Sequence, residues 1–154
     1  MIIINDEEAL RIKCEDVLPE EIDDLRAKLE EGLKYSYSMG RPGIGLACPQ
    51  IGIGKRMAIV RINTGTGQSV DVDLVNCRIA EGYDQRPFNG EGCLSFPDMS
   101  VKTMRYTEIK VVDNAVEPKE FIATGLLAVC IQHELDHLNG VLLPDLDIDR
   151  VRGK

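Results

Sequence analysis

The sequence predicts one α+β domain spanning residues 1–154, with mixed and antiparallel β-sheets around a central helix that carries a His-Glu-x-x-His motif. Three observations lead to this prediction. Two segments have apolar residues at helical spacing, and several others have the β-branched residues of strands. No repeat, low-complexity tract or Pro/Gly/Ser-rich linker divides the chain.

The composition predicts a globular protein that does not bind polyanions. Lys and Arg number 18 against 26 Asp and Glu, so the formal net charge is −8, and 44% of the residues are hydrophobic. This apolar content is enough for a core. Binding to nucleic acid or to an anionic membrane needs clustered cations, so we expect neither partner.

The cysteines and the amino terminus predict a cytoplasmic protein. Five scattered cysteines do not match the spacing of a small disulfide-bonded secreted domain. The apolar run at residues 1–4 is too short for a signal peptide or a transmembrane helix.

The first half of the chain predicts a helix, a loop and a hairpin. Pro19 with two acidic residues is typical of a helix start, and apolar residues at helical spacing extend this helix to about residue 37. Residues 40–54 contain five glycines and two prolines, which favours an ordered loop. Strands are expected at residues 57–62 and 70–75, paired across a turn.

The second half predicts further strands and the central helix. Residues 101–112 have strand character, and residues 121–123 read as a short returning strand. A largely buried helix is expected from Thr124, as N-cap, to the Asn139-Gly140 pair.

The two histidines of the chain, His133 and His137, are four residues apart on this helix. At about 100° per residue, their side chains lie on one face and can point at one ion. Glu134 can reach a water on that ion. Core histidines satisfied by hydrogen bonds are the structural alternative, but both histidines and the Glu fit the motif, so we favour a metal site. Asp136 lies on another side of the helix, so we expect it to support a ligand or cap the helix rather than bind the ion.

A third metal ligand is not evident near the motif. Zinc proteases of the thermolysin type use a downstream Glu as third ligand, but the 17 residues after His137 include no Glu. The longer metalloprotease pattern has a third His, and Leu143 occupies that position here. A thiolate from Cys93 or Cys130 is an attractive third ligand, because the chain has no other His and its cysteines fit a reducing compartment. We favour Cys93, because the flanking glycines let the backbone approach an ion closely.

The glycine-rich segment at residues 43–50 is not a dinucleotide-binding loop, because it follows a helix, precedes a strand and lacks the third glycine. Two interpretations of Gln50 remain: its amide faces a substrate, or it has a structural role.

Three separated segments together carry a family resemblance. They are residues 43–50, the Glu-Gly-Cys-Leu-Ser run at 91–95 and the segment Gln-His-Glu-Leu-Asp-His-Leu-Asn-Gly at 132–140. In order and spacing they resemble the three signature motifs of peptide deformylases, a resemblance that extends over nearly the whole chain. It implies a metal-dependent hydrolase that removes the N-formyl group from the formylmethionine of nascent polypeptides and releases formate.

The resemblance also implies the roles of individual residues. The metal ion, Fe(II) in the usual physiological form with Zn, Ni or Co as substitutes, would be bound by Cys93, His133 and His137. Glu134 would act as general base and then general acid as a metal-activated hydroxide attacks the formyl carbon. The implied oxyanion donors are the Gln50 amide and the Leu94 N–H, and Glu91 would pair with Arg105. The substrate-binding residues would be Gly45, Ile44, Leu126, Val129 and Cys130, the last four forming a methionine pocket.

The same resemblance implies a cellular setting. The substrate would be the nascent chain near the ribosome exit, and the protein a cytoplasmic monomer or weak dimer. The chain ends at Lys154 without the C-terminal helix of many bacterial members, as in phage-encoded short forms, so either source is consistent. Two other functions stay open, a zinc endopeptidase and a catalytically silent module that binds formyl-peptides.

Overall fold

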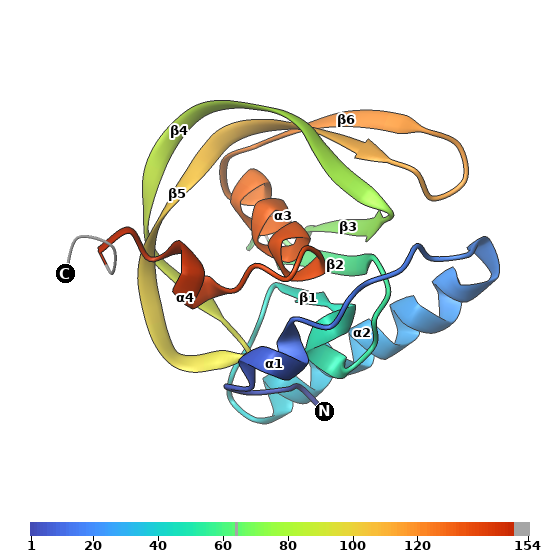
Figure 1. The fold of residues 1–154 in the computed structure, drawn as a ribbon, viewed down its shortest axis with the longest axis horizontal. Helices are drawn as coiled ribbons and strands as arrows, with labels where there is room; N and C mark the ends of the chain where they lie inside the picture. The colour runs from blue at the N-terminus through green and yellow to red at the C-terminus, as the bar shows by residue number, and fades with distance from the viewer. Residues whose placement is uncertain (64, 150–154) are drawn as a thin grey trace.

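The computed structural model describes residues 1–63 and 65–149, which form two three-stranded sheets with helices between and beside them (Figure 1). The elements in chain order are α1 (Glu7–Leu10), η1 (Pro19–Glu21), α2 (Ile22–Ser38), β1 (Gly45–Ala47), η2 (Cys48–Ile51), β2 (Met57–Asn63), β3 (Ser69–Val75), β4 (Cys77–Cys93), β5 (Phe96–Asp113), β6 (Lys119–Thr124), α3 (Gly125–Leu138) and α4 (Leu143–Leu146). The predicted α+β class is confirmed.

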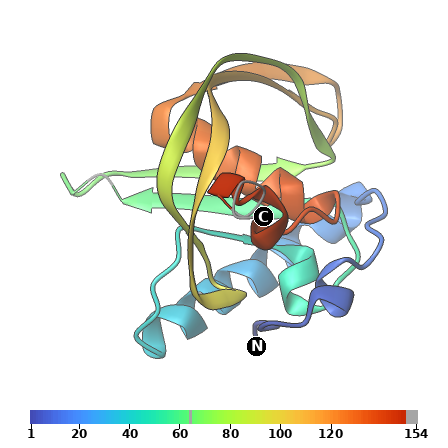
Figure 2. The same ribbon diagram turned by 60° about the vertical axis from the view of Figure 1, so that its left-hand side comes forward.

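Helix α3 lies between the two sheets, and α2 covers the other face of the β1-β2-β3 sheet (Figures 1 and 2). The two buried faces of strand β2 explain this layered arrangement. Its buried residues alternate, so that Ala58 and Val60 face the cluster containing α3, whereas Met57 and Ile59 face the cluster containing α2. A strand buried on both faces reads as a continuous apolar run, and removing these side chains from water stabilises the layers.

Strands β4 and β5 form a long antiparallel hairpin that arches over α3 (Figure 2). Its register is irregular near the tip: Phe88 pairs with Thr103, but Glu91 pairs with Val101, so β4 contains one extra residue there. Gly90, with φ of 73°, lies in this bulge. An extra residue turns the following side chains to the other face of the strand, and Glu91 is buried.

Most of the predicted elements are confirmed. The first helix corresponds to η1 and α2, and the hairpin pairs residue 57 with residue 75 and residue 63 with residue 69. The predicted strands at 101–112 and 121–123 lie within β5 and β6, and the central helix is α3. Thr124 occupies the N-cap position, although its side chain makes no capping hydrogen bond, and Gly140 has a φ of 73° just beyond the end of α3.

Three expectations are corrected. Residues 40–54 are not only a loop, because β1 pairs with β2 and η2 follows it. The sequence does not predict strand β4, because its many polar residues and its bulges interrupt the alternation of apolar and polar residues that marks a strand. Both sheets are antiparallel rather than mixed; among the described residues, parallel pairing is limited to a bridge between Glu15 and Lys55.

Within residues 1–63 and 65–149, no helix has the length and apolar character needed to cross a lipid bilayer.

Asn76 joins the segment before η1 to the turn between β3 and β4. It has a φ of 52°, in the left-handed region. Its Oδ1 accepts from the Val17 N–H at 2.8 Å, and its Nδ2 donates to the Val17 carbonyl at 3.0 Å. Asn tolerates this backbone conformation better than most residues, and its amide supplies both a donor and an acceptor.

Asn76→Ala should lower the free energy of unfolding by about 1–3 kcal/mol, because it leaves both polar groups of Val17 without their partner. Urea denaturation measures the change. Asn114→Ala is the matched control, since Asn114 is exposed and makes one long hydrogen bond of 3.5 Å. Equal effects of the two substitutions would contradict the assignment.

Candidate active site

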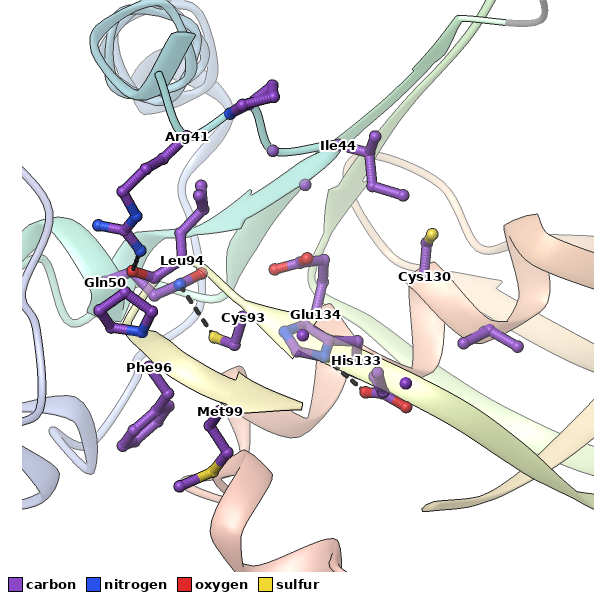
Figure 3. A pocket seen from close by; sticks show the side chains of 18 of the residues that line it. Arg41, Ile44, Gln50, Cys93, Leu94, Phe96, Met99, Cys130, His133 and Glu134 are labelled. Atoms are coloured by element: carbon purple, nitrogen blue, oxygen red, sulfur yellow. Dashed lines mark hydrogen bonds and ion pairs between the residues drawn. The ribbon is translucent and has the colours of Figure 1, made fainter. Parts of the chain in front are cut away.

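A pocket of about 470 Å³ opens where three parts of the fold meet (Figure 3). Its walls come from the segment between α2 and η2, from the tip of the β4–β5 hairpin and from the first turns of α3. They overlap the three segments that the sequence singles out. Of the thirteen predicted site residues, all except Arg105 and His137 line the pocket.

Cys93, His133 and His137 converge beside this pocket. Their ligand atoms lie within 4.8 Å of one another, and Cys93 Sγ is 3.3 Å from His137 Nε2. The histidines meet because positions four apart share one face of α3, and Cys93 reaches them from the end of β4. Cys130, the other candidate third ligand, is not part of this group.

A buried carboxylate, Glu91, orients His133. Its Oε2 accepts from His133 Nδ1 at 2.7 Å and from Arg105 Nη2 at 2.6 Å. Its Oε1 accepts from Thr103 Oγ1 at 2.7 Å and from Arg105 Nε at 2.9 Å. Because His133 donates through Nδ1 to the carboxylate, Nε2 is left as the atom that can bind a metal ion.

The pKa values of the two histidines are shifted in opposite directions. Burial opposes the charged form of His133, but hydrogen bonds to Cys93 and Glu91 outweigh burial and hold its pKa well above the usual value. Burial, followed by the charge of His133, lowers the pKa of His137. His137 Nδ1 is buried and has no hydrogen-bond partner within the described part of the chain.

Glu134 is buried next to Gly45. Within the described residues, its Oε1 has no hydrogen-bond partner, and a Cβ at position 45 would overlap its Oε2, so a glycine leaves the space that the carboxylate occupies. Burial raises the pKa of Glu134 to about 7, with the charge of His133 acting in the opposite direction. A buried unpaired carboxylate costs stability, which is a reason to expect a functional role.

Gln50 lies on the side of Cys93 opposite to Glu134 (Figure 3), and its side chain is only 1% exposed. Its Oε1 accepts from the Ala47 N–H at 3.0 Å, whereas its Nε2 donates to Ser95 Oγ at 3.1 Å and lies 3.7 Å from Cys93 Sγ. The amide therefore fastens η2 to the hairpin tip. The second N–H of its Nε2 points toward Cys93 Sγ, with which it makes only a long, weak hydrogen bond.

The four predicted apolar residues all line the pocket. Val129 and Cys130 are buried, and Ile44 and Leu126 are 40% and 50% exposed. Burial raises the pKa of the Cys130 thiol to about 12, which keeps it neutral. An apolar wall with an open rim suits an unbranched hydrophobic side chain that enters from solvent.

Comparison with known proteins decides the family. The family model for polypeptide deformylase matches residues 1–152. The chain belongs to the peptide deformylase family. A peptide deformylase of Microchaete diplosiphon is 40% identical over 125 residues, which are 80% of this chain and 66% of that protein, so the match spans about two thirds of the relative's length.

Solved peptide deformylases have the same fold. A probable peptide deformylase from Synechococcus phage S-SSM7 superposes with a TM-score of 0.81 at 34% identity, covering 95% of this chain and 98% of that chain. A Met-Ala-Ser-bound class I type b peptide deformylase of Acinetobacter baumannii gives 0.75 at 30% identity, covering 95% and 96%. Peptide deformylases are metal-dependent, and the Cys-His-His group is a possible metal site in this chain.

Sequence reasoning missed several residues of this peptide deformylase site. Thr103 completes the hydrogen bonds of Glu91. Asp136, expected only as a supporting partner, accepts from Arg105 Nη1 at 2.6 Å, and the sequence did not indicate that contact. Neither contact has a local signal, because both partners lie on other elements. The pocket also contains residues that the sequence did not single out: Arg41, Pro42, Phe88, Phe96, Pro97 and Met99.

Arg105→Met should lower the free energy of unfolding by about 3–5 kcal/mol, because it leaves the buried Glu91 carboxylate without its guanidinium. Arg86→Met is the control for loss of a surface ion pair, since Arg86 pairs with an exposed Asp84. Chemical denaturation of both variants gives the comparison, and a loss for Arg105→Met no larger than for the control would show that the buried pair does not stabilise the hairpin.

Proposed function

We propose that this protein hydrolyses the formamide of N-formylmethionyl peptides and releases formate. The observation that carries the proposal is the buried Glu134 carboxylate, unpaired at Oε1, beside a Cys-His-His group and an apolar pocket. Membership of the peptide deformylase family supports it, as does the Met-Ala-Ser peptide bound to the A. baumannii relative.

The residues present fit a divalent metal ion. Cys93, His133 and His137 offer one thiolate and two imidazoles whose ligand atoms are mutually close, and Glu91 holds His133 in the tautomer that leaves Nε2 free. This donor set suits Fe(II), Zn, Ni and Co. We assign Fe(II) as the physiological ion, with the other three as substitutes, on the family resemblance. When bound, the ion supplies Lewis acidity toward water and the formyl carbonyl.

Glu134 moves the proton of the reaction. Its carboxylate takes a proton from the attacking water as the bond from the water oxygen to the formyl carbon forms. It then gives that proton to the methionine nitrogen as the C–N bond breaks, so the products are formate and a free amine. The absence of a Cβ at Gly45 leaves the space that this carboxyl group occupies.

Backbone and amide donors stabilise and position the substrate. We assign Gln50 Nε2 and the Leu94 N–H to the negative charge that develops on the formyl oxygen. Gln50 can do so by exchanging its weak contact with Cys93 Sγ while keeping Ser95. The Gly45 backbone would hold the peptide chain, and the methionine side chain would enter the wall formed by Ile44, Leu126, Val129 and Cys130.

The cellular setting follows from this substrate. Formylated amino termini arise on nascent chains, so we place the protein in the cytoplasm near the ribosome exit, as a monomer or weak dimer. All five cysteines are free thiols, which is consistent with a reducing compartment.

Metal-loaded protein should release formate from formyl-Met-Ala-Ser, and Glu134→Gln should lower kcat by about 10²- to 10⁴-fold, because an amide cannot carry the proton. Metal content should be unchanged in this variant. Anaerobic assay of formate with parallel metal analysis makes the measurement.

Glu117→Gln, at an exposed position, is the control and should keep full activity. Cleavage of internal bonds in an unformylated peptide would instead indicate an endopeptidase. Binding of the formyl-peptide without formate release by fully loaded protein would indicate a silent binding module.

Cys93→Ser should abolish tight binding of the metal ion, whereas Cys130→Ser should retain one ion per chain, because only Cys93 lies with the two histidines. Both thiols are replaced by the same hydroxyl, so the pair is internally matched. Metal analysis after dialysis decides, and the reverse pattern would assign the third ligand to Cys130.

A further inference from the structure

One cation stands out in the pocket. Among the described residues that line it, Arg41 is the only Lys or Arg. Figure 3 places the Arg41 side chain toward one end of the pocket and Cys130 toward the other, with Glu134 between them. A substrate whose methionine side chain lies on the apolar wall continues from its carbonyl end, and the residues that follow can meet this positive charge.

The backbone of Arg41 is fixed by the end of α2. Gly40 has a φ of 72°, its N–H donates to the Tyr37 carbonyl at 3.0 Å, and the Arg41 N–H donates to the Ser36 carbonyl at 2.9 Å. These two bonds form a Schellman motif, which ends the helix and directs the chain into the pocket wall. The position of Arg41 is therefore set before any ligand binds.

The guanidinium is mostly unpaired. Its Nη2 donates to the Leu94 carbonyl at 2.6 Å, which holds the side chain across the pocket. Within the described part of the chain this is its only hydrogen bond, and no carboxylate lies within 4.0 Å of it. A guanidinium has five N–H donors in a planar fork, so a second edge remains for a carboxylate.

We propose that Arg41 determines specificity by binding a carboxylate that follows the formylmethionine in the substrate. This inference rests on the proposed function. A formylated amino terminus has no positive charge, so an acidic group downstream is not offset by an ammonium at the other end of a short peptide. The molecule as a whole has a net charge of −8 and repels acidic peptides, which makes the local cation the feature that can select them.

Two carboxylate sources have this chemistry, an acidic side chain and the free carboxyl end of a short peptide. Formyl-Met-Ala-Glu-amide against formyl-Met-Ala-Gln-amide tests the side chain, and formyl-Met-Ala against formyl-Met-Ala-amide tests the carboxyl end. The quantity measured is the ratio of kcat/KM within each pair, for metal-loaded wild type, Arg41→Met, Arg41→Lys and Arg78→Met.

We expect wild type to prefer the acidic member of at least one pair by about tenfold, mainly through KM, and the preference to weaken at high salt. Arg41→Met should bring the ratio close to 1, and Arg41→Lys should retain part of it because a point charge replaces the fork. Arg78 is exposed and outside the pocket, so Arg78→Met should keep the wild-type ratio.

A purely structural loss at Arg41 would lower both members of a pair equally and leave the ratio unchanged, which overturns the proposal. Ratios of 1 in both pairs for wild type would also overturn it. Calorimetric binding of Met-Ala-Glu-amide and Met-Ala-Gln-amide needs no turnover. A preference for the acidic peptide that Arg41→Met removes would therefore support Arg41 even if no formate were released, whereas absence of formate release by itself contradicts only the proposed function.

Discussion

The candidate site depends on one buried carboxylate. Glu91 accepts hydrogen bonds from Thr103 and Arg105 of β5 and from His133 of α3, so a single side chain of β4 joins the hairpin to the central helix. Desolvation alone would raise the pKa of Glu91, but hydrogen bonds from His133 and Arg105 lower it to about 2. The carboxylate therefore remains charged, and a charged, fully bonded acceptor holds the imidazole in one tautomer.

The β4–β5 hairpin provides the geometry that this interaction needs. The bulge at Gly90 changes the face on which the following residues lie, so that Glu91 is turned inward and Cys93 reaches the pocket at the strand end. Arg105 extends the network to Asp136 of α3. The Cys-His-His group is thus held by two layers of the protein rather than by the helix alone, which limits how far the thiol and imidazoles can separate.

Close approach of β1 to α3 sets the other side of the site. Gly45 lies against the Glu134 carboxylate with no room for a Cβ, and Gln50 in η2 ties the same segment to Ser95 at the hairpin tip. Three chain segments far apart in sequence therefore meet around a small volume. The buried and unpaired Oε1 of Glu134 lies within it, and the stability lost there is offset by the two apolar clusters on either side of the β1-β2-β3 sheet.

The sequence by itself determined the parts that depend on local spacing. Two histidines four apart with Glu134 between them must share a helical face, and the alternating strands at 57–75 pair because a short turn joins them. Only the tertiary structure decided what depends on contacts between distant segments. In the folded chain Cys93, and not Cys130, lies with the two histidines, and Arg41 lies in the pocket. Strand β4 forms despite its bulges, and the glycine-rich segment forms β1 and η2. Residues that meet across separate elements leave no periodic signal in the chain, because their proximity arises from strand register and layer packing.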